Sequence, residues 1–111
     1  MDELAQYRQI IKNFLTHLAQ FQPAHGDVEV NVVVDEQHDS YLLIDAGWHK
    51  QQRIYGNVVH LDIRNGKVWL QHNATELDVA QELIEAGIPR DRIVVGFHPP
   101  HERQYTGYAV A

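Results

Sequence analysis

His60 and Asp62 are the residues whose types and spacing first suggest chemistry. They lie two positions apart in an apolar run that alternates in the manner of a β-strand, so both side chains should project from one face. A carboxylate beside an imidazole can orient a general base or support a metal ligand. The same spacing also suits a polar pair that helps to set the register of a strand. The pattern leaves both interpretations open.

The histidines His98 and His101, which flank Pro99 and Pro100, are the second candidate. Histidine pairs at short spacing are common in zinc sites, but two ligands fall short of a structural shell, so His60 or His49 would have to converge from elsewhere. Each proline fixes its own φ and restricts the residue before it. We therefore expect a rigid corner in which the prolines stop the helical geometry that brings an i, i+3 pair together, and which either contributes to a metal site or simply exposes its imidazoles.

The residues that follow this corner point to recognition rather than catalysis. Arg103 and Tyr105 are of types enriched at interface hot spots, so we expect a recognition patch unless Arg103 pairs with a neighbouring acid such as Glu102. Trp48 and Trp69 end or interrupt apolar strand patterns and are expected to be core or interface anchors rather than ligand platforms. The expected interaction surface comprises His60, Asp62, Trp69, His98, Pro99, Pro100, His101, Arg103 and Tyr105.

Enzyme signatures are absent from the sequence. There is no GxxxxGK(S/T), GxGxxG, HExxH or GxSxG motif. The chain has no cysteine, which excludes disulfides and thiolate metal sites. Ser40 is the only serine, and it follows His38 and Asp39 directly, an arrangement that turn chemistry explains better than a catalytic triad. We expect no enzyme, cofactor or metal; a metal-dependent or small-ligand-binding module built on the two histidine regions is the alternative.

Composition narrows the class of partner. The formal net charge is −6, from nine Lys and Arg against fifteen Asp and Glu, and the positive residues are scattered. Tight DNA binding needs a concentrated basic footprint, so direct binding to duplex DNA is not expected. The 111 residues fit one domain, residues 1–111. No apolar run approaches the roughly 18 residues of a membrane span and no signal peptide is recognisable, so a cytoplasmic protein is expected.

Two helices are predicted from the spacing of apolar residues. Residues 3–21 have apolar side chains at three-four spacing, with Asp2 as the expected N-cap and the segment 23–26, which contains proline and glycine, beyond the helix end. Thr75 is expected to cap a second helix. Gly87, followed by a proline, ends it.

The strand patterns predict an α+β fold with two layers. Asn65-Gly66 is the strongest hairpin signal, and the other short connections also favour an antiparallel β-meander. Both helices should pack on one apolar face. In the second run the face shared by Leu42 and Ile44 is predicted to be the core face. The outer face then mixes polar and apolar residues, which indicates either a partner surface or scattered surface hydrophobes. The strand patterns cover residues 28–35, 42–48, 55–64, 67–71 and 93–97.

Segments spread over nearly the whole chain resemble one protein family. On these residues the chain resembles the XisI family, the excision controlling factors of the fdxN element in nitrogen-fixing filamentous cyanobacteria. The matching residues are 41–43, 47–48, 53, 56, 59–63, 66–71, 75–76, 85–89 and, most specifically, Phe97-His98-Pro99-Pro100 and Arg103-Gln104-Tyr105-Thr106-Gly107-Tyr108-Ala109-Val110.

The resemblance implies a small accessory factor without enzymatic activity of its own. It implies a role in the site-specific excision of a DNA element during heterocyst differentiation, beside a site-specific recombinase complex and a companion protein, XisH. It carries over no catalytic residue. The acidic charge balance suits a factor that binds protein better than one that binds DNA. Self-association through the half-apolar outer face is left open by the sequence.

Overall fold

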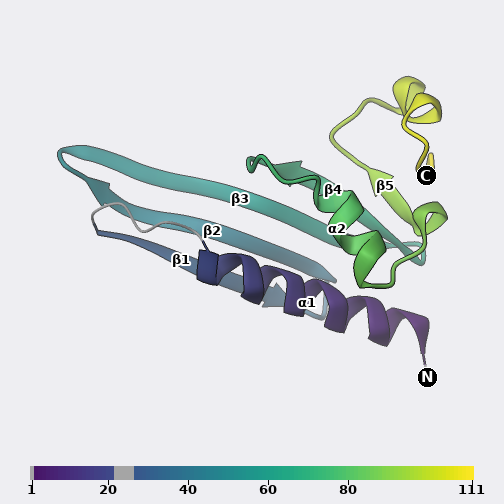
Figure 1. Ribbon diagram of the computed structural model, residues 1–111, viewed down its shortest axis with the longest axis horizontal. Coiled ribbons are helices and arrows are strands. Elements are labelled where there is room, and N and C mark those ends of the chain that lie inside the picture. Colours follow the sequence, from purple (N-terminus) through teal and green to yellow (C-terminus); the bar gives the residue numbers. More distant parts are fainter. Residues whose placement is uncertain (1, 22–26) are drawn as a thin grey trace.

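A five-stranded sheet in the order β1-β2-β3-β4-β5 carries both helices on one face (Figure 1). The computed structural model describes residues 2–21 and 27–111. The arrangement confirms the predicted two-layer α+β class. The elements are α1 Glu3–Phe21, β1 Asp27–Asp35, β2 Ser40–His49, β3 Gln52–Arg64, β4 Lys67–Asn73, α2 Val79–Ala86 and β5 Ile93–Val95, with short 3-10 helices η1 Arg90–Arg92 and η2 Pro100–Tyr105.

Strands β1 to β4 form the predicted antiparallel meander, whereas β5 runs parallel to β4. The turn between β3 and β4 has positive φ at both Asn65 and Gly66, as a type I′ hairpin requires. A parallel neighbour needs a crossover connection, and α2 provides it. The sequence predicted a strand at this position without its direction.

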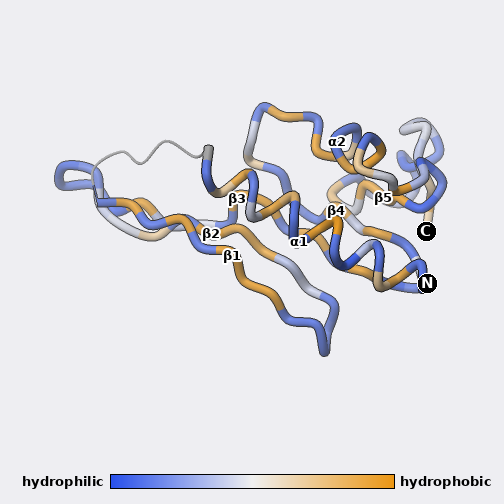
Figure 2. The backbone as a smooth tube through the Cα atoms, turned by 60° about the horizontal axis from the view of Figure 1, so that its bottom comes forward, coloured by the Kyte–Doolittle hydropathy of each residue, from blue (hydrophilic) through white to orange (hydrophobic). Residues whose placement is uncertain are grey.

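The core lies between the sheet and the two helices. The predicted stripe of α1 buries Tyr7, Ile11 and Leu15 against the sheet, and Leu83 of α2 joins the same cluster. Figure 2 shows hydrophobic residues along the strands and hydrophilic residues at the hairpin turns. The Phe21 side chain and the predicted helix stop at residues 23–26 lie outside the part of the chain that the structure describes.

Helix α2 begins later than predicted. Its N-cap is Asp78, whose side chain accepts a hydrogen bond from the Gln81 backbone N–H at 3.1 Å. The predicted cap, Thr75, instead donates its hydroxyl proton to Asn73 at 2.6 Å and accepts from the Leu77 N–H, which makes a turn before the helix. The predicted stop is confirmed, since Gly87 takes a φ of 121° and donates its N–H to the end of the helix.

The predicted orientation of β2 is wrong. Tyr41 and Leu43 are fully buried on the helix face, while Leu42 and Ile44 face outward. Pairing with β1 sets this phase, because Leu43 lies opposite Val32 on the row that packs against the core. Apolar residues occupy both phases of β2, so alternation alone could not choose between them. We call the side of the sheet opposite the helices the outer face.

Two register shifts shape the sheet next to the candidate site. Between β2 and β3 the register places Val58 as an extra residue. Between β3 and β4, His60 pairs with His72 and Leu61 with Leu70, which leaves Gln71 as the extra residue. Such bulges bend a strand and redirect its side chains.

In the described ranges, no helix combines the length and the apolar character that a membrane crossing requires.

Gly47 of β2 is expected to tolerate no side chain. A Cβ there would overlap the carbonyl oxygen of Asp27 and lie 2.6 Å from the Cα of Val28. Gly47→Ala should therefore lower the free energy of unfolding by about 1–3 kcal/mol, measured by equilibrium urea unfolding. Gly56→Ala on β3 is the matched control, because a Cβ there meets no atom within 4 Å. Equal losses in the two variants would contradict this explanation.

Candidate functional site

The carboxylate of Asp62 lies at the centre of a buried polar cluster on the outer face. The residue is only 2% exposed. Its Oδ1 accepts hydrogen bonds from Ser40 Oγ at 2.7 Å and His60 Nε2 at 2.8 Å. Its Oδ2 accepts from Arg64 Nη2 at 3.0 Å and Gln71 Nε2 at 3.2 Å. These five residues, the Asp62 cluster, join β2, β3 and β4.

The electrostatics of the Asp62 cluster favour an ionised carboxylate. Burial disfavours the charged form, but the hydrogen bonds from Ser40 and His60 outweigh it, so the pKa of Asp62 lies below its usual range. The charge is balanced at the rim, since the side chain of Arg64 is 60% exposed and still contacts Asp62. A buried carboxylate with four donors is a satisfied polar group.

The Asp62 cluster contains Ser, His and Asp but not the geometry of a catalytic triad. In a triad the imidazole bridges the carboxylate and the serine hydroxyl. Here Ser40 and His60 both donate to the same Oδ1 of Asp62, so the serine proton goes to the carboxylate. The predicted projection of His60 and Asp62 from one face is confirmed by their contact. The arrangement supports cross-strand bonding rather than nucleophile activation.

The predicted interaction surface lacks three members of the Asp62 cluster, namely Ser40, Arg64 and Gln71. The sequence favours turn chemistry for Ser40, but the residue pairs directly with Asp62 across β2 and β3. Gln71 reaches the carboxylate from the register shift in β4. The contact of Ser40 with Asp62 follows from the pairing register of β2 and β3. Predicting that register requires the exact ends of the turn at residues 36–39. The bulge that brings Gln71 to Asp62 cannot be recognised from the alternation of apolar and polar residues in the sequence.

Trp69 and Arg103 connect the Asp62 cluster to the C-terminal corner. Trp69 pairs with Asp62 in the sheet, and the Arg103 guanidinium lies 5.1 Å from its ring centroid. Arg103 Nε donates to the carbonyl of His98 at 3.0 Å, with a longer contact to the Gly96 carbonyl at 3.5 Å. This arrangement differs from the alternative pairing with Glu102. Arg103 thus fixes the backbone of the corner against the sheet.

The His98-Pro-Pro-His101 corner is only partly as predicted. Pro99 is extended, with φ −64° and ψ 152°, so His98 and His101 do not share a helix, as expected; His101 itself, however, lies in η2, which begins at Pro100. A proline in the first turn of a helix removes no hydrogen bond, because that N–H has no intrahelical partner. His98 Nδ1 lies 4.0 Å and His101 Nε2 3.9 Å from the carboxylate of Glu102.

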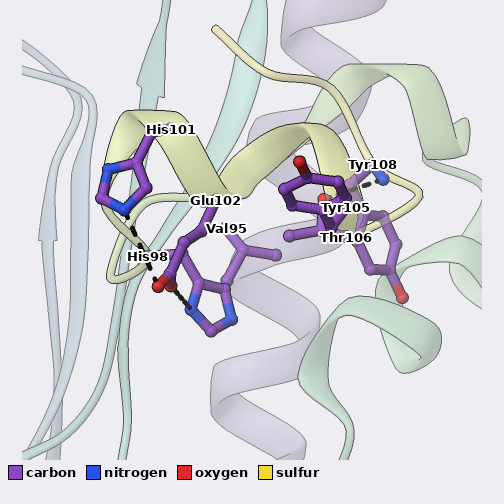
Figure 3. A pocket seen from close by; sticks show the side chains of 7 residues that line it. All are labelled: Val95, His98, His101, Glu102, Tyr105, Thr106 and Tyr108. Atoms are coloured by element: carbon purple, nitrogen blue, oxygen red, sulfur yellow. Dashed lines mark hydrogen bonds and ion pairs between the residues drawn. The ribbon is translucent and has the colours of Figure 1, made fainter.

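An open depression of about 680 Å³ accompanies this corner (Figure 3). The two imidazoles flank the Glu102 carboxylate on one side of it, and the tyrosines lie on the other. Tyr105 is 82% exposed and is therefore available to a partner. The lining residues are Val95, His98, His101, Glu102, Tyr105, Thr106 and Tyr108.

The histidines do not converge as a shared metal site would require. Within residues 2–21 and 27–111, no group of three or more His, Asp or Glu side chains is arranged to hold a metal ion. His60 binds Asp62, whereas His98 and His101 face Glu102. The two predicted histidine regions therefore belong to separate polar clusters.

Asp45 of β2 is a further, partly buried titratable residue outside the predicted interaction surface. Its Oδ1 is buried without a hydrogen-bond partner in the described structure, and burial raises the pKa of the carboxyl. It lines a second depression, of about 540 Å³, together with Gly56 and Thr75. The phase of β2 that buries Tyr41 also turns Asp45 toward the helix side of the sheet.

The fold and site define an α+β protein whose outer face holds a buried polar cluster and whose C-terminal corner is rigid and exposed. A model of one family, described as XisI protein, matches residues 1–110 of the chain. The chain therefore belongs to the XisI family.

Two solved structures from Anabaena variabilis ATCC 29413 are similar to this chain over nearly its whole length. A XisI-like protein is 41% identical with a TM-score of 0.93, covering 98% of this chain and 100% of the other. The fdxN element excision controlling factor XisI is 34% identical with a TM-score of 0.85, covering 99% of this chain and 100% of the other. No curated protein matches the chain.

Ionisation of Asp62 should make stability depend on pH. Because the folded pKa is depressed, its stabilising contribution is present above the ordinary value of about 3.9 and is lost as pH falls through the folded pKa. The free energy of unfolding, from urea titrations at a series of pH values, should fall between about pH 5 and pH 2.

Asp62→Asn should lower the free energy of unfolding at neutral pH by about 1–3 kcal/mol and flatten this acid limb. Asp35→Asn is the control, because the pKa of Asp35 is also lowered, chiefly by its hydrogen bond to His38, but that pair lies in an exposed turn. An Asp62→Asn protein with an unchanged acid limb would rule out the role assigned to this carboxylate.

Proposed function

We propose that this protein is a controlling factor of site-specific DNA-element excision that acts by binding a companion protein and performs no chemistry itself. The companion would be a XisH-like protein. The process would be the excision of an fdxN-type element in the cytoplasm during heterocyst differentiation, and the two proteins would act beside a site-specific recombinase complex. Membership in the XisI family and the 34% identity to an fdxN element excision controlling factor support the proposal.

The observation that carries the proposal is the contrast between two groups of polar residues. The serine, histidine and aspartate that could have formed a reactive centre bind one another in the Asp62 cluster. The residues of the corner are exposed instead, with Tyr105 at 82% and the His101 side chain at 78%. Reactive side chains are thus occupied, while recognition side chains face solvent.

The corner is also organised before any partner arrives. Arg103 binds the His98 carbonyl, and Thr106 Oγ1 donates to the Arg103 carbonyl at 2.8 Å. A preordered segment loses less conformational entropy when it binds, which raises affinity without new contacts. Tyrosine adds a large, rigid and amphipathic contact at low entropic cost.

The net charge favours a protein partner over duplex DNA. A chain with a formal charge of −6 repels phosphates, and its basic residues are scattered along the sequence. Complementary charge on a partner steers association and suppresses wrong partners. The surface of the companion that contacts this protein should therefore be basic.

Tyr105→Ala should weaken binding to a purified XisH-like companion without loss of fold. An exposed tyrosine that acts as a hot spot contributes about 2 kcal/mol or more, which corresponds to a rise of roughly 30-fold in dissociation constant. Isothermal titration calorimetry measures the affinity, and circular dichroism checks the fold. Leu77→Ala, at another exposed apolar side chain, is the control and should leave the affinity unchanged. Equal affinities for Tyr105→Ala and the unmodified protein would remove Tyr105 from the contact.

The isolated protein should show no tight binding to duplex DNA at moderate salt. Fluorescence anisotropy with a labelled duplex, repeated over a series of salt concentrations, measures this. Tight binding by the protein alone, with an affinity that falls steeply as salt rises, would indicate phosphate contacts and contradict the proposal.

A further inference from the structure

A row of apolar side chains runs along β2 on the outer face. Leu42, Ile44, Ala46 and Trp48 occupy the outward phase of this strand. Trp48 is 51% exposed. Isolated surface hydrophobes need no explanation, but a continuous apolar row with a tryptophan at its end indicates a surface that another chain covers.

The strands on either side of this row carry different polar side chains. On β1 the outward residues include Asp27, Glu29 and Asn31, all exposed. Each of them pairs with one residue of β2, and that residue pairs in turn with one residue of β3. The outward rows across the three strands are Asp27–Trp48–Arg53, Glu29–Ala46–Tyr55, Asn31–Ile44–Asn57, Val33–Leu42–His60 and Asp35–Ser40–Asp62.

A second copy of the chain fits this pattern about one particular twofold axis. This axis runs parallel to β2, just above the outer face. Rotation about it sets β1 of one copy over β3 of the other, and each residue keeps its position along the strand direction. Asp27 then comes over Arg53 of the second copy, which pairs opposite charges. Each contact occurs twice, as an isologous interface requires.

Two of the remaining rows are complementary about the same axis, and another sets Asp35 over Asp62 of the second copy, whose charge Arg64 already balances. Glu29 comes over the phenol of Tyr55, which can donate to a carboxylate, and Asn31 comes over Asn57, since amides both donate and accept. The β2 rows of the two copies meet at the centre, apolar against apolar. A polar rim around an apolar core is the usual anatomy of a protein interface.

Charge disfavours the other in-plane orientation. A twofold axis perpendicular to the strands would set β1 over β1 and bring Asp27 over Asp35 of the second copy at both ends. Antiparallel edge pairing of two β1 strands over their full length would also place Asp27 opposite Asp35. Like charges in such positions are destabilising.

We propose that the outer face of β1, β2 and β3 is the interface of a twofold homodimer in which the β2 rows pack together and Asp27 pairs with Arg53 of the second copy. Arg53 is already positioned, because its guanidinium lies between Trp48 at 5.4 Å and Tyr55 at 5.8 Å, measured to the ring centroids. Trp, Tyr and Arg are the residue types that dominate interface hot spots.

The dimer leaves the C-terminal corner free. Because β1 of the second copy lies over β3, nothing of its sheet extends over β4 and β5, the strands that the C-terminal segment contacts. The homodimer therefore goes beyond the proposed function and does not depend on it. Companion binding and self-association would use different surfaces of the same molecule.

The mass of the full chain in solution tests the proposal. Light scattering coupled to size exclusion, with sedimentation equilibrium for the affinity, should give twice the mass of one chain. Leu42→Asp places an unpaired charge at the centre of the interface and should raise the dimer dissociation constant by about 100-fold or more. Glu85→Arg, at an exposed residue of α2 on the other side of the sheet, is the control and should leave the dimer intact. A monomeric unmodified protein throughout the micromolar range would overturn the proposal.

A charge exchange tests the orientation with exposed residues only. Asp27→Arg and Arg53→Asp should each weaken the dimer by about fivefold to tenfold, because each removes two symmetric ion pairs. The double variant should regain most of the affinity, since the pairs form again with reversed charges. This orientation would be overturned if the dissociation constant of the double variant rose by the product of the two single-variant increases. Circular dichroism of every variant shows whether the fold is kept.

Discussion

The ionised carboxylate of Asp62 is the group on which the outer face depends. It is almost completely buried, and donors from β2, β3 and β4 converge on it. One of them, Gln71, also packs against Gly96, where a Cβ would come within 2.6 Å of its Oε1. The cluster therefore fixes three strands relative to one another and sets the point at which the chain leaves β5. Loss of one donor would leave a buried charge poorly compensated.

This constraint divides the outer face into two parts. Over β4 and β5 the C-terminal segment returns to the sheet, with Arg103 above the Trp69 ring and the Ala109 N–H bonded to the Ile93 carbonyl. Over β1, β2 and β3 the face remains open and combines an apolar centre with charged margins. The helices occupy the other side of the sheet. A small α+β protein can thus present two separate surfaces to other chains.

The sequence predicted those features whose signals are local. The stripe of α1, the Asn65-Gly66 turn and the stop at Gly87 each depend on residues close in the chain. Features that depend on pairing between distant segments were not predictable in the same way. The phase of β2 is ambiguous because Tyr41, Leu42, Leu43 and Ile44 are all apolar, and the contact of Gln71 with Asp62 follows from a register shift that alternation does not record. The direction of β5 depends on how α2 crosses the sheet.

The most direct test of this account is the pKa of the Asp62 carboxyl group in the folded protein. Carbon-13 NMR of the side-chain carboxyl carbon, followed through a pH titration of the full chain, measures it residue by residue. The account predicts a pKa below the ordinary value of about 3.9, because the donors hold the ionised form in place. A pKa at or above that value would contradict it, since the carboxyl would then titrate as a buried group that its neighbours do not stabilise.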